Sequence, residues 1–267
     1  MPFTRLKFFR CAALVTTVLG SVLTSACAAS AAPAVTLPPA GAGFDYQIGG
    51  PYEPPAGVEI VSRDHGVAPA PGLYNICYVN AFQSQPRTEA GWGDLLLRDD
   101  HGEVVHDPEW EEEALLDIRK DTRQRVAERV EVWIDECAAK GYQAVEPDNF
   151  DSFSRSQDLI SEDDAQQYIR LLSAHAHAKG LAIAQKNTSE FSGHRTGNGL
   201  DFAIAEECGQ QKNCDEFTAG FGRQVIVLEY TAKGLANACD RWSELSIVRR
   251  DKLVAPKGSS AYLRQTC

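Results

Sequence analysis

Residues 161–187 read SEDDAQQYIRLLSAHAHAKGLAIAQKN and contain a helix, a glycine and a strand in succession. Ser161 is followed by three acidic residues, which is typical of a helix start, and apolar residues at helical spacing continue to Lys179. Gly180 is suited to end that helix, because glycine readily adopts the left-handed conformation found there. The apolar run Leu181–Asn187 then has the length of a strand. The stretch therefore predicts a fold of the α/β class.

The same succession recurs along the rest of the chain. Runs such as Val225–Leu228 are apolar on both faces, as in parallel strands covered by helices, and Lys120–Lys140 carries a helical apolar stripe. Because strands alternate with helices and no G-x-G-x-x-G motif follows the first strand, we expect a (β/α)8 barrel of the TIM type. A doubly wound open sheet is the alternative. The expected strands are Phe44–Gln47, Val58–Asp64, Tyr74–Asn80, Leu115–Arg119, Tyr142–Asn149, Leu181–Asn187, Asp201–Glu207 and Val225–Tyr230.

Two further segments bear on the barrel. The short apolar run Ser246–Val248 could be an extra strand, so the numbering of the barrel strands stays open by one. The stretch Gly91–Pro108 has turn residues at Asp99–Gly102. It predicts a small β-hairpin inserted over one loop of the barrel.

The N-terminus reads as a targeting segment. Three basic residues within 1–10 precede the apolar stretch Cys11–Leu23, and small residues follow, which is typical of a secretory signal peptide over residues 1–29. Cleavage by ordinary signal peptidase would release the protein, whereas cleavage before Cys27 would leave a lipid anchor on that cysteine. Residues 30–43, rich in Ala, Pro and Gly, predict a flexible tether before a barrel domain over 44–267.

Charge and composition limit the partners. The chain has a net charge of −11, and removal of residues 1–29 takes away three basic residues and no acid, which makes it −14. No basic stripe could neutralise phosphates, so we expect no nucleic acid partner. We expect an extracellular monomer, in contact with a membrane only through a lipid anchor at Cys27.

Six cysteines remain after removal of the signal peptide, and an even number in an exported chain predicts disulfides. Six cysteines allow 15 pairings, among which the sequence alone does not choose. Cys208 with Cys214 closes a short loop, and Cys239 with Cys267 would fix the C-terminus, which leaves Cys77 with Cys137. No C-x-x-C pair occurs, so zinc is not expected, and we expect no metal or cofactor.

Polar and acidic residues stand where the expected strands end. In a (β/α)8 barrel these positions converge on one mouth, where the active sites of such enzymes lie. A carboxylate at a strand end can instead cap the next helix, but glutamate is a poor cap. The residues expected at the mouth are Asp45, Tyr46, Gln47, Asp64, Tyr78, Asn80, Asp117, Glu146, Asp148, Asn149, Lys186, Asn187, Glu206, Glu207, Glu229 and Tyr230.

A mouth lined by acids suits the cleavage of glycosidic bonds. One carboxylic acid protonates the leaving oxygen and a second carboxylate supports the anomeric carbon. Period-two alternation places Glu146 and Asp148 on one face of their strand. Glu206 and Glu207 face opposite ways, so only one of them can point into the mouth.

Six short motifs in this order resemble glycoside hydrolase family 114, the endo-α-1,4-polygalactosaminidase-like proteins. The resemblance covers residue 44 to the C-terminus. It implies a (β/α)8 barrel, secretion, no metal or organic cofactor, and hydrolysis of α-1,4 links in galactosamine-containing polysaccharide. The motifs are Phe44–Gln47, Asn75–Tyr78, Glu146–Asn149, Gln185–Asn187, Ala205–Cys208 and Glu229–Tyr230.

Carried over to this chain, the family's catalytic aspartate falls on Asp148 and its catalytic glutamate on Glu206. We expect Asp148 to be the nucleophile and Glu206 the acid/base, with Glu207 as the alternate if the strand faces the other way. The other residues expected to contact substrate are Asp45, Tyr46, Gln47, Asp64, Tyr78, Asn80, Glu146, Asn149, Lys186, Asn187, Glu207, Glu229 and Tyr230. Two alternatives remain open, a metal-dependent polysaccharide deacetylase and a catalytically silent glycan-binding lipoprotein.

Overall fold

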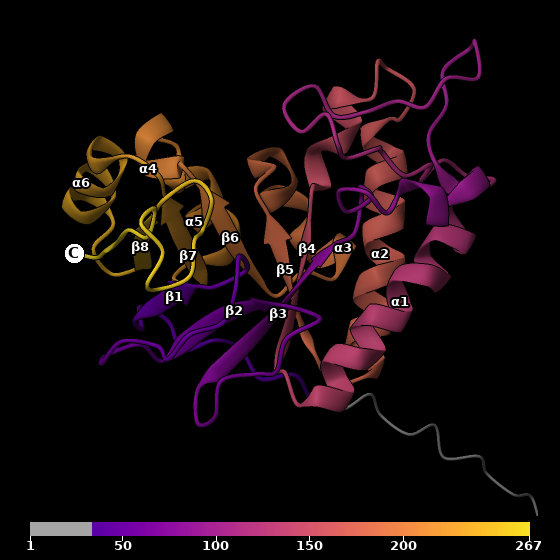
Figure 1. The fold of residues 1–267 in the computed structure, drawn as a ribbon. Coiled ribbons are helices and arrows are strands. Elements are labelled where there is room, and N and C mark those ends of the chain that lie inside the picture. Colours follow the sequence, from indigo (N-terminus) through magenta and orange to yellow (C-terminus); the bar gives the residue numbers. More distant parts are fainter. Residues whose placement is uncertain (1–33) are drawn as a thin grey trace, which may run out of the picture. The chain divides into compact units, whose positions relative to one another are not determined.

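The computed structural model describes residues 34–267 (Figure 1). The expected signal peptide 1–29, the candidate anchor Cys27 and residues 30–33 of the expected tether lie outside the described residues. Within the rest of the tether, the Thr36 carbonyl accepts a 2.6 Å hydrogen bond from the Tyr74 hydroxyl, and Ala42 is buried. No helix within residues 34–267 is long and apolar enough to span a bilayer.

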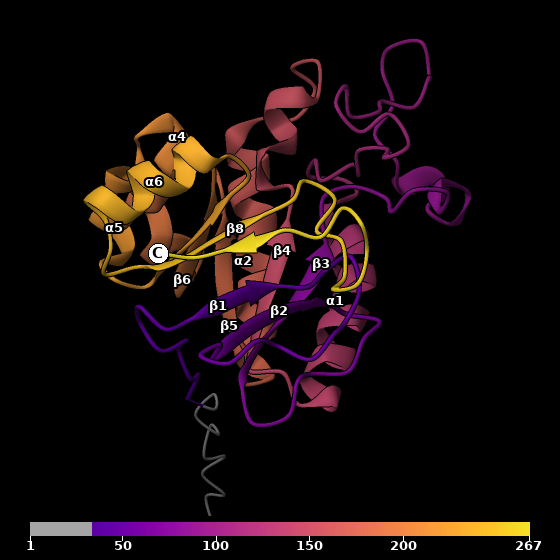
Figure 2. The same cartoon turned by 60° about the vertical axis from the view of Figure 1, so that its left-hand side comes forward.

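The strands form one sheet whose spatial order follows the sequence from β1 to β9. The first eight strands are parallel, and the short β9 pairs antiparallel with β8. This curled parallel sheet with its helices confirms the expected α/β, TIM-type fold (Figures 1 and 2). The strands are β1 Phe44–Tyr46, β2 Ile60–Asp64, β3 Tyr74–Asn80, β4 Ala144–Asp148, β5 Ala182–Lys186, β6 Phe202–Glu206, β7 Val225–Glu229, β8 Ser246–Arg250 and β9 Arg264–Gln265.

The helices begin and end where local chemistry favours it. α2 has a capping box, in which the Ser161 hydroxyl accepts from the Asp164 amide and the Asp164 carboxylate accepts from the Ser161 amide. α1 ends at Gly141, whose φ of 89° is unfavourable for other residues. The helices are α1 Arg123–Lys140, α2 Glu162–Ala178, α3 Arg195–Asn198, α4 Cys208–Gln211, α5 Cys214–Phe221 and α6 Ala232–Arg241; the 3-10 turns are η1 Glu89–Gly91, η2 Gly93–Leu95, η3 Phe150–Arg155 and η4 Ser189–His194.

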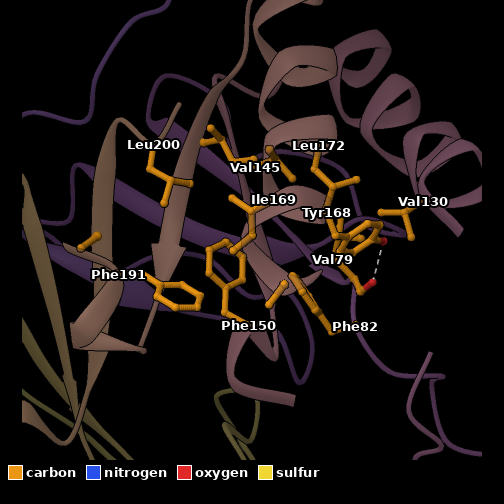
Figure 3. Close-up of a cluster of buried hydrophobic side chains, with 14 of the residues drawn as sticks. Val79, Phe82, Val130, Val145, Phe150, Tyr168, Ile169, Leu172, Phe191 and Leu200 are labelled. Carbon is orange, nitrogen blue, oxygen red and sulfur yellow. Dashed lines mark hydrogen bonds between the residues drawn. The ribbon is translucent and has the colours of Figure 1, made fainter. Parts of the chain in front are cut away.

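Alternation along the strands divides the apolar residues into two cores. One face of each strand packs against the helices, as Val79 and Val145 do beneath Ile169 and Leu172 of α2 (Figure 3). In this outer core the Tyr168 hydroxyl finds a partner 2.9 Å away in the Ala81 carbonyl. The opposite face fills the inside of the barrel with Phe44, Ile60, Ile76, Ala144, Ala182, Ala184, Phe202, Ile204, Ile226, Leu228 and Val248.

The expected barrel strand Leu115–Arg119 is wrong. Leu115 and Leu116 form only isolated antiparallel bridges, within an insertion between β3 and α1. The run is apolar because it packs on Leu95–Leu97 of the same insertion, and not because it belongs to the barrel. The segment Ser246–Val248, considered as an extra strand, lies in β8 and completes the parallel set.

The expected hairpin over Gly91–Pro108 is only partly formed. Its turn is present, since the Gly102 amide donates to the Asp99 carbonyl over 3.0 Å, and Arg98 and Val104 form a single antiparallel bridge. The first residues of the segment instead form the 3-10 turn η2.

The structure forms the three expected disulfides. Cys77–Cys137 joins β3 to α1, and Cys208–Cys214 joins α4 to α5. Cys239–Cys267 attaches the C-terminal residue to α6. The last of these holds β9 close to the sheet seam, where Arg264 donates to the Phe44 carbonyl of β1 over 3.0 Å.

Candidate active site

A pocket of about 440 Å³ opens at the carboxyl ends of the strands. Its floor consists of residues at or just after strand ends, from both halves of the barrel. Its size lies within the range of ligand sites, about 300–1,000 Å³. The strand-end residues that line it are Tyr46, Asp64, Tyr78, Asp148, Asn149, Asn187, Glu206 and Tyr230.

Lys186 is the centre of the charges beneath this pocket. Its side chain is 1% exposed, and its ammonium lies 3.1 Å from a Glu146 oxygen and 3.1 Å from an Asp148 oxygen. A Glu206 oxygen lies 3.5 Å from the same ammonium. Burial lowers the pKa of Lys186, but the charges of Asp148 and Glu206 outweigh burial and hold this pKa well above its usual value. Lys186 is therefore a permanent cation that gathers three carboxylates from β4 and β6.

Asp148, the last residue of β4, is held ionised. It accepts hydrogen bonds from the Tyr78 hydroxyl and from the Asn149 amide, each over 2.8 Å. Burial by itself raises the pKa of this carboxyl, but Lys186 and the Tyr78 hydroxyl lower it further, so the net pKa lies below its usual value. A buried carboxylate kept charged in this way is suited to act as a nucleophile or base.

Glu206, the last residue of β6, lies across Lys186 from Asp148. One of its oxygens accepts from the Asn187 side-chain amide over 2.8 Å, and the other accepts from the Tyr230 hydroxyl. The Asn187 carbonyl oxygen also accepts from the Glu206 backbone amide over 2.8 Å. The carboxyl is thus oriented by two neighbouring strands while remaining partly open to the pocket.

Glu146 lies one pleat below Asp148 and is fully buried. It accepts from the Ser62 hydroxyl over 2.5 Å and from the Tyr46 hydroxyl over 2.9 Å. Burial raises the pKa of Glu146, and Lys186 opposes this rise without cancelling it. Glu146 is absent from the pocket wall, so it holds Lys186 in place from below.

Backbone geometry after the strands aims the neighbouring residues. Asn149 and Asn187 have φ of 68° and 48°, in the left-handed region that asparagine tolerates better than most residues. Glu207, with φ of 58°, also lies there. Its backbone therefore turns away from the strand direction, and Glu207 is not among the pocket residues.

Three expected site residues lie behind the barrel wall. Asp45 and Gln47 are buried and hydrogen-bonded to each other over 2.9 Å, and Arg264 approaches Asp45 to 3.2 Å at the seam. Glu229 accepts from the Gly209 amide of α4 over 2.7 Å, and burial raises its pKa to about 7. Strand alternation places these side chains on the opposite face from Tyr46 and Tyr230.

The remaining expected residues divide between rim and support. Asp64 lines the rim, where it also accepts from the Gly66 amide over 2.8 Å. Asn80 is buried and connects Asn149 to Glu113 of the insertion. Asp117 pairs with Arg119 over 2.8 Å outside the pocket, because its segment is not a barrel strand.

Sequence reasoning did not predict several pocket residues. Asp107, Glu113, Arg155 and Lys252 line the wall but follow no predicted strand end. Only proximity in the folded chain brings them there. Ser62 had a signal, since it lies two residues before Asp64 on the same face of β2.

The comparisons agree with this architecture. The model of glycoside-hydrolase family GH114 matches residues 24–267. Ega3 of Aspergillus fumigatus, solved with galactosamine, has a TM-score of 0.70 at 20% identity, over 87% of this chain and 98% of that chain. The glycoside hydrolase domain of PelA from Pseudomonas aeruginosa has a TM-score of 0.54 at 15% identity, over 82% and 97%. No curated protein matches the sequence. Because the family model spans nearly the whole chain, this protein belongs to glycoside hydrolase family 114.

Proposed function

We propose that the protein is an exported, endo-acting glycoside hydrolase that cleaves α-1,4 linkages in galactosamine-rich polysaccharide. Asp148 is the nucleophile and Glu206 the acid/base. The observation that carries the proposal is the Lys186 ammonium, which lies within 3.5 Å of both carboxylates at the floor of the pocket. The galactosamine bound to Ega3, a protein of similar fold, supports the substrate class.

The spacing of the two carboxylates favours a retaining reaction. Since Lys186 lies 3.1 Å from an Asp148 oxygen and 3.5 Å from a Glu206 oxygen, these oxygens are at most about 6.6 Å apart. Retaining glycosidases separate their carboxyl groups by about 5–5.5 Å and inverting ones by about 6.5–9.5 Å. The upper limit thus meets only the lower edge of the inverting range, and a water molecule would not fit comfortably between the pair.

The two carboxyl groups have environments suited to different tasks. Asp148 is stabilised as an anion by Lys186, Tyr78 and the Asn149 amide, as an attacking carboxylate requires. Glu206 has two donors from Asn187 and Tyr230 and is farther from the ammonium. In the first step Glu206 gives its proton to the leaving oxygen while Asp148 bonds to the anomeric carbon. In the second step Glu206 takes a proton from the water that releases the sugar.

Export is supported by the three disulfides, because such bonds persist in oxidising compartments outside the cytosol. Release or lipid anchoring at Cys27 stays a prediction. Mass spectrometry of the mature N-terminus distinguishes them, since an anchored protein begins at an acylated Cys27.

Digestion of defined α-1,4 galactosamine oligomers tests the function. Mass spectrometry should find internal cleavage products, and proton NMR should find that the first-formed product keeps the α configuration. A β product would refute the retaining assignment. Loss of acetyl groups without chain cleavage would identify a deacetylase instead, and binding without any product would identify a glycan-binding protein.

A further inference from the structure

One wall of the pocket comes from the insertion between β3 and α1 and not from the strand ends. Within it, the loop of residues 107–113 places Trp110 and Glu113 on the pocket lining. Trp110 is 56% exposed, which is unusual for so large an apolar side chain. An exposed indole beside a polar pocket is the platform on which sugar rings stack, because their C–H faces are apolar.

The loop is rigid because Asp107 holds it from inside. This carboxylate is 1% exposed and accepts from the backbone amides of Glu109 and Trp110 over 2.8 and 3.1 Å. The side chains of Gln83 and Arg155 donate to it over 2.6 and 2.5 Å. Four donors on one buried carboxylate fix the position of Trp110 before any ligand binds.

Hydrogen bonds connect Glu113 to the catalytic aspartate. Glu113 accepts from the Asn80 amide over 2.9 Å, and Asn80 in turn accepts from the Asn149 amide over 2.9 Å. The Asn149 backbone donates to Asp148 over 2.8 Å. Glu113 is thus two side chains away from Asp148, on the same wall as Trp110.

Glu113 lacks a cationic partner of its own. Burial raises its pKa most, and the charges of Asp148 and Asp107 add to burial against Asn80 and Arg155, which brings the pKa to about 7. Arg155, the nearby cation, is already paired with Asp107 and Asp151. Seven carboxylates line the pocket against two cationic side chains, so a bound cation would relieve their repulsion.

We propose that Trp110 and Glu113 form a subsite for an unacetylated aminosugar unit beside Asp148, with the indole against the ring and the carboxylate paired with the ammonium group. The proposal rests on the proposed function and names the determinant of its selectivity. An N-acetylated unit has no charge at this position, so it would gain from Trp110 but not from Glu113.

Matched variants test the two contacts separately. Glu113→Gln keeps the shape and removes the charge, and we expect kcat/KM to fall about tenfold on deacetylated oligomers and less than about twofold on N-acetylated ones. Trp110→Ala should lower kcat/KM several-fold on both. The control is Glu112→Gln, an exposed neighbour outside the pocket with the same change of charge, which should match the wild type on both substrates.

Equal losses on both substrates, or no loss, in Glu113→Gln would overturn the ammonium pairing. Unchanged activity in Trp110→Ala would overturn the platform. Calorimetric binding of a deacetylated trimer to Glu206→Gln, with and without Glu113→Gln, separates the subsite from the reaction. If the wild type cleaves neither polymer but binding still depends on Glu113, the proposed function fails and the subsite stands.

Discussion

Replacement of Lys186 by methionine tests the charge arrangement that the site depends on. The side chain keeps a similar length, but the ammonium within 3.1 Å of Glu146 and Asp148 is lost. Glu146 is fully buried and Asp148 is mostly so, and removal of one partner of a buried ion pair costs about 3–5 kcal/mol. We expect a loss of that size in the free energy of unfolding at pH 7, together with an activity loss on the order of 10³-fold.

The loss should shrink at lower pH. Asp148 has a lowered pKa in the folded wild type, so its stabilising contribution is present above its unfolded pKa and disappears as pH falls through the folded value. The pKa of Lys186 is raised, so its charge is complete throughout the range from pH 5 to 8. In the variant Asp148 and Glu146 can instead take up protons as pH falls, which removes the unpaired charges.

Urea unfolding followed by tryptophan fluorescence at pH 5 and pH 7, with the disulfides intact, measures this. The double variant Lys186→Met with Glu146→Gln should recover about half of the lost stability, because it no longer buries one of the unpaired carboxylates. Lys179→Met is the control, since Lys179 pairs with Asp135 at the surface and should matter by less than about 1 kcal/mol. A Lys186→Met variant within about 1 kcal/mol of the wild type at pH 7 would refute the reasoning.

Three further predictions concern the pair, the C-terminus and the field of the pocket. Asp148→Asn and Glu206→Gln should each lose on the order of 10³-fold in kcat while Glu207→Gln stays near wild type; the opposite result for the two glutamates in the same kinetic assay would reverse their assignment. Replacing Cys239 and Cys267 by serine should lower the free energy of unfolding by about 2–4 kcal/mol in a urea titration, and free thiols at both positions in a non-reducing peptide map of the wild type would contradict the bridge. For deacetylated oligomers kcat/KM should fall between 0.01 and 0.15 M salt, as the Debye length shortens from about 30 Å to about 8 Å; a flat response would exclude electrostatic attraction by the acidic pocket.

The sequence specified the α/β class because its signals are local. The capping residues of α2, Gly141 after α1 and the apolar runs of the strands act within a few residues of one another. The wrong strand shows the limit of such signals. Leu115–Arg119 has the same apolar character as a barrel strand, and periodicity cannot distinguish packing on the barrel from packing within an insertion.

The seam of the sheet could not be read from local pattern. Arg250 in β8 is fully buried, which a strand prediction would not favour. Its guanidinium lies 3.5 Å from Asp45 of β1, more than two hundred residues earlier in the chain. A partner so distant in sequence is brought near only when the sheet curls and its first and last parallel strands meet.

For the site, the sequence determined which residue types stand at the strand ends, and period-two alternation placed Glu146 and Asp148 on one face. Tertiary structure decided which of these residues share a space. It directed Glu229 into the helix layer and brought Glu113 from an insertion to the pocket wall. Alternation fixes a side chain only relative to its own strand, whereas the curl of the sheet and the path of the insertion depend on packing between distant segments.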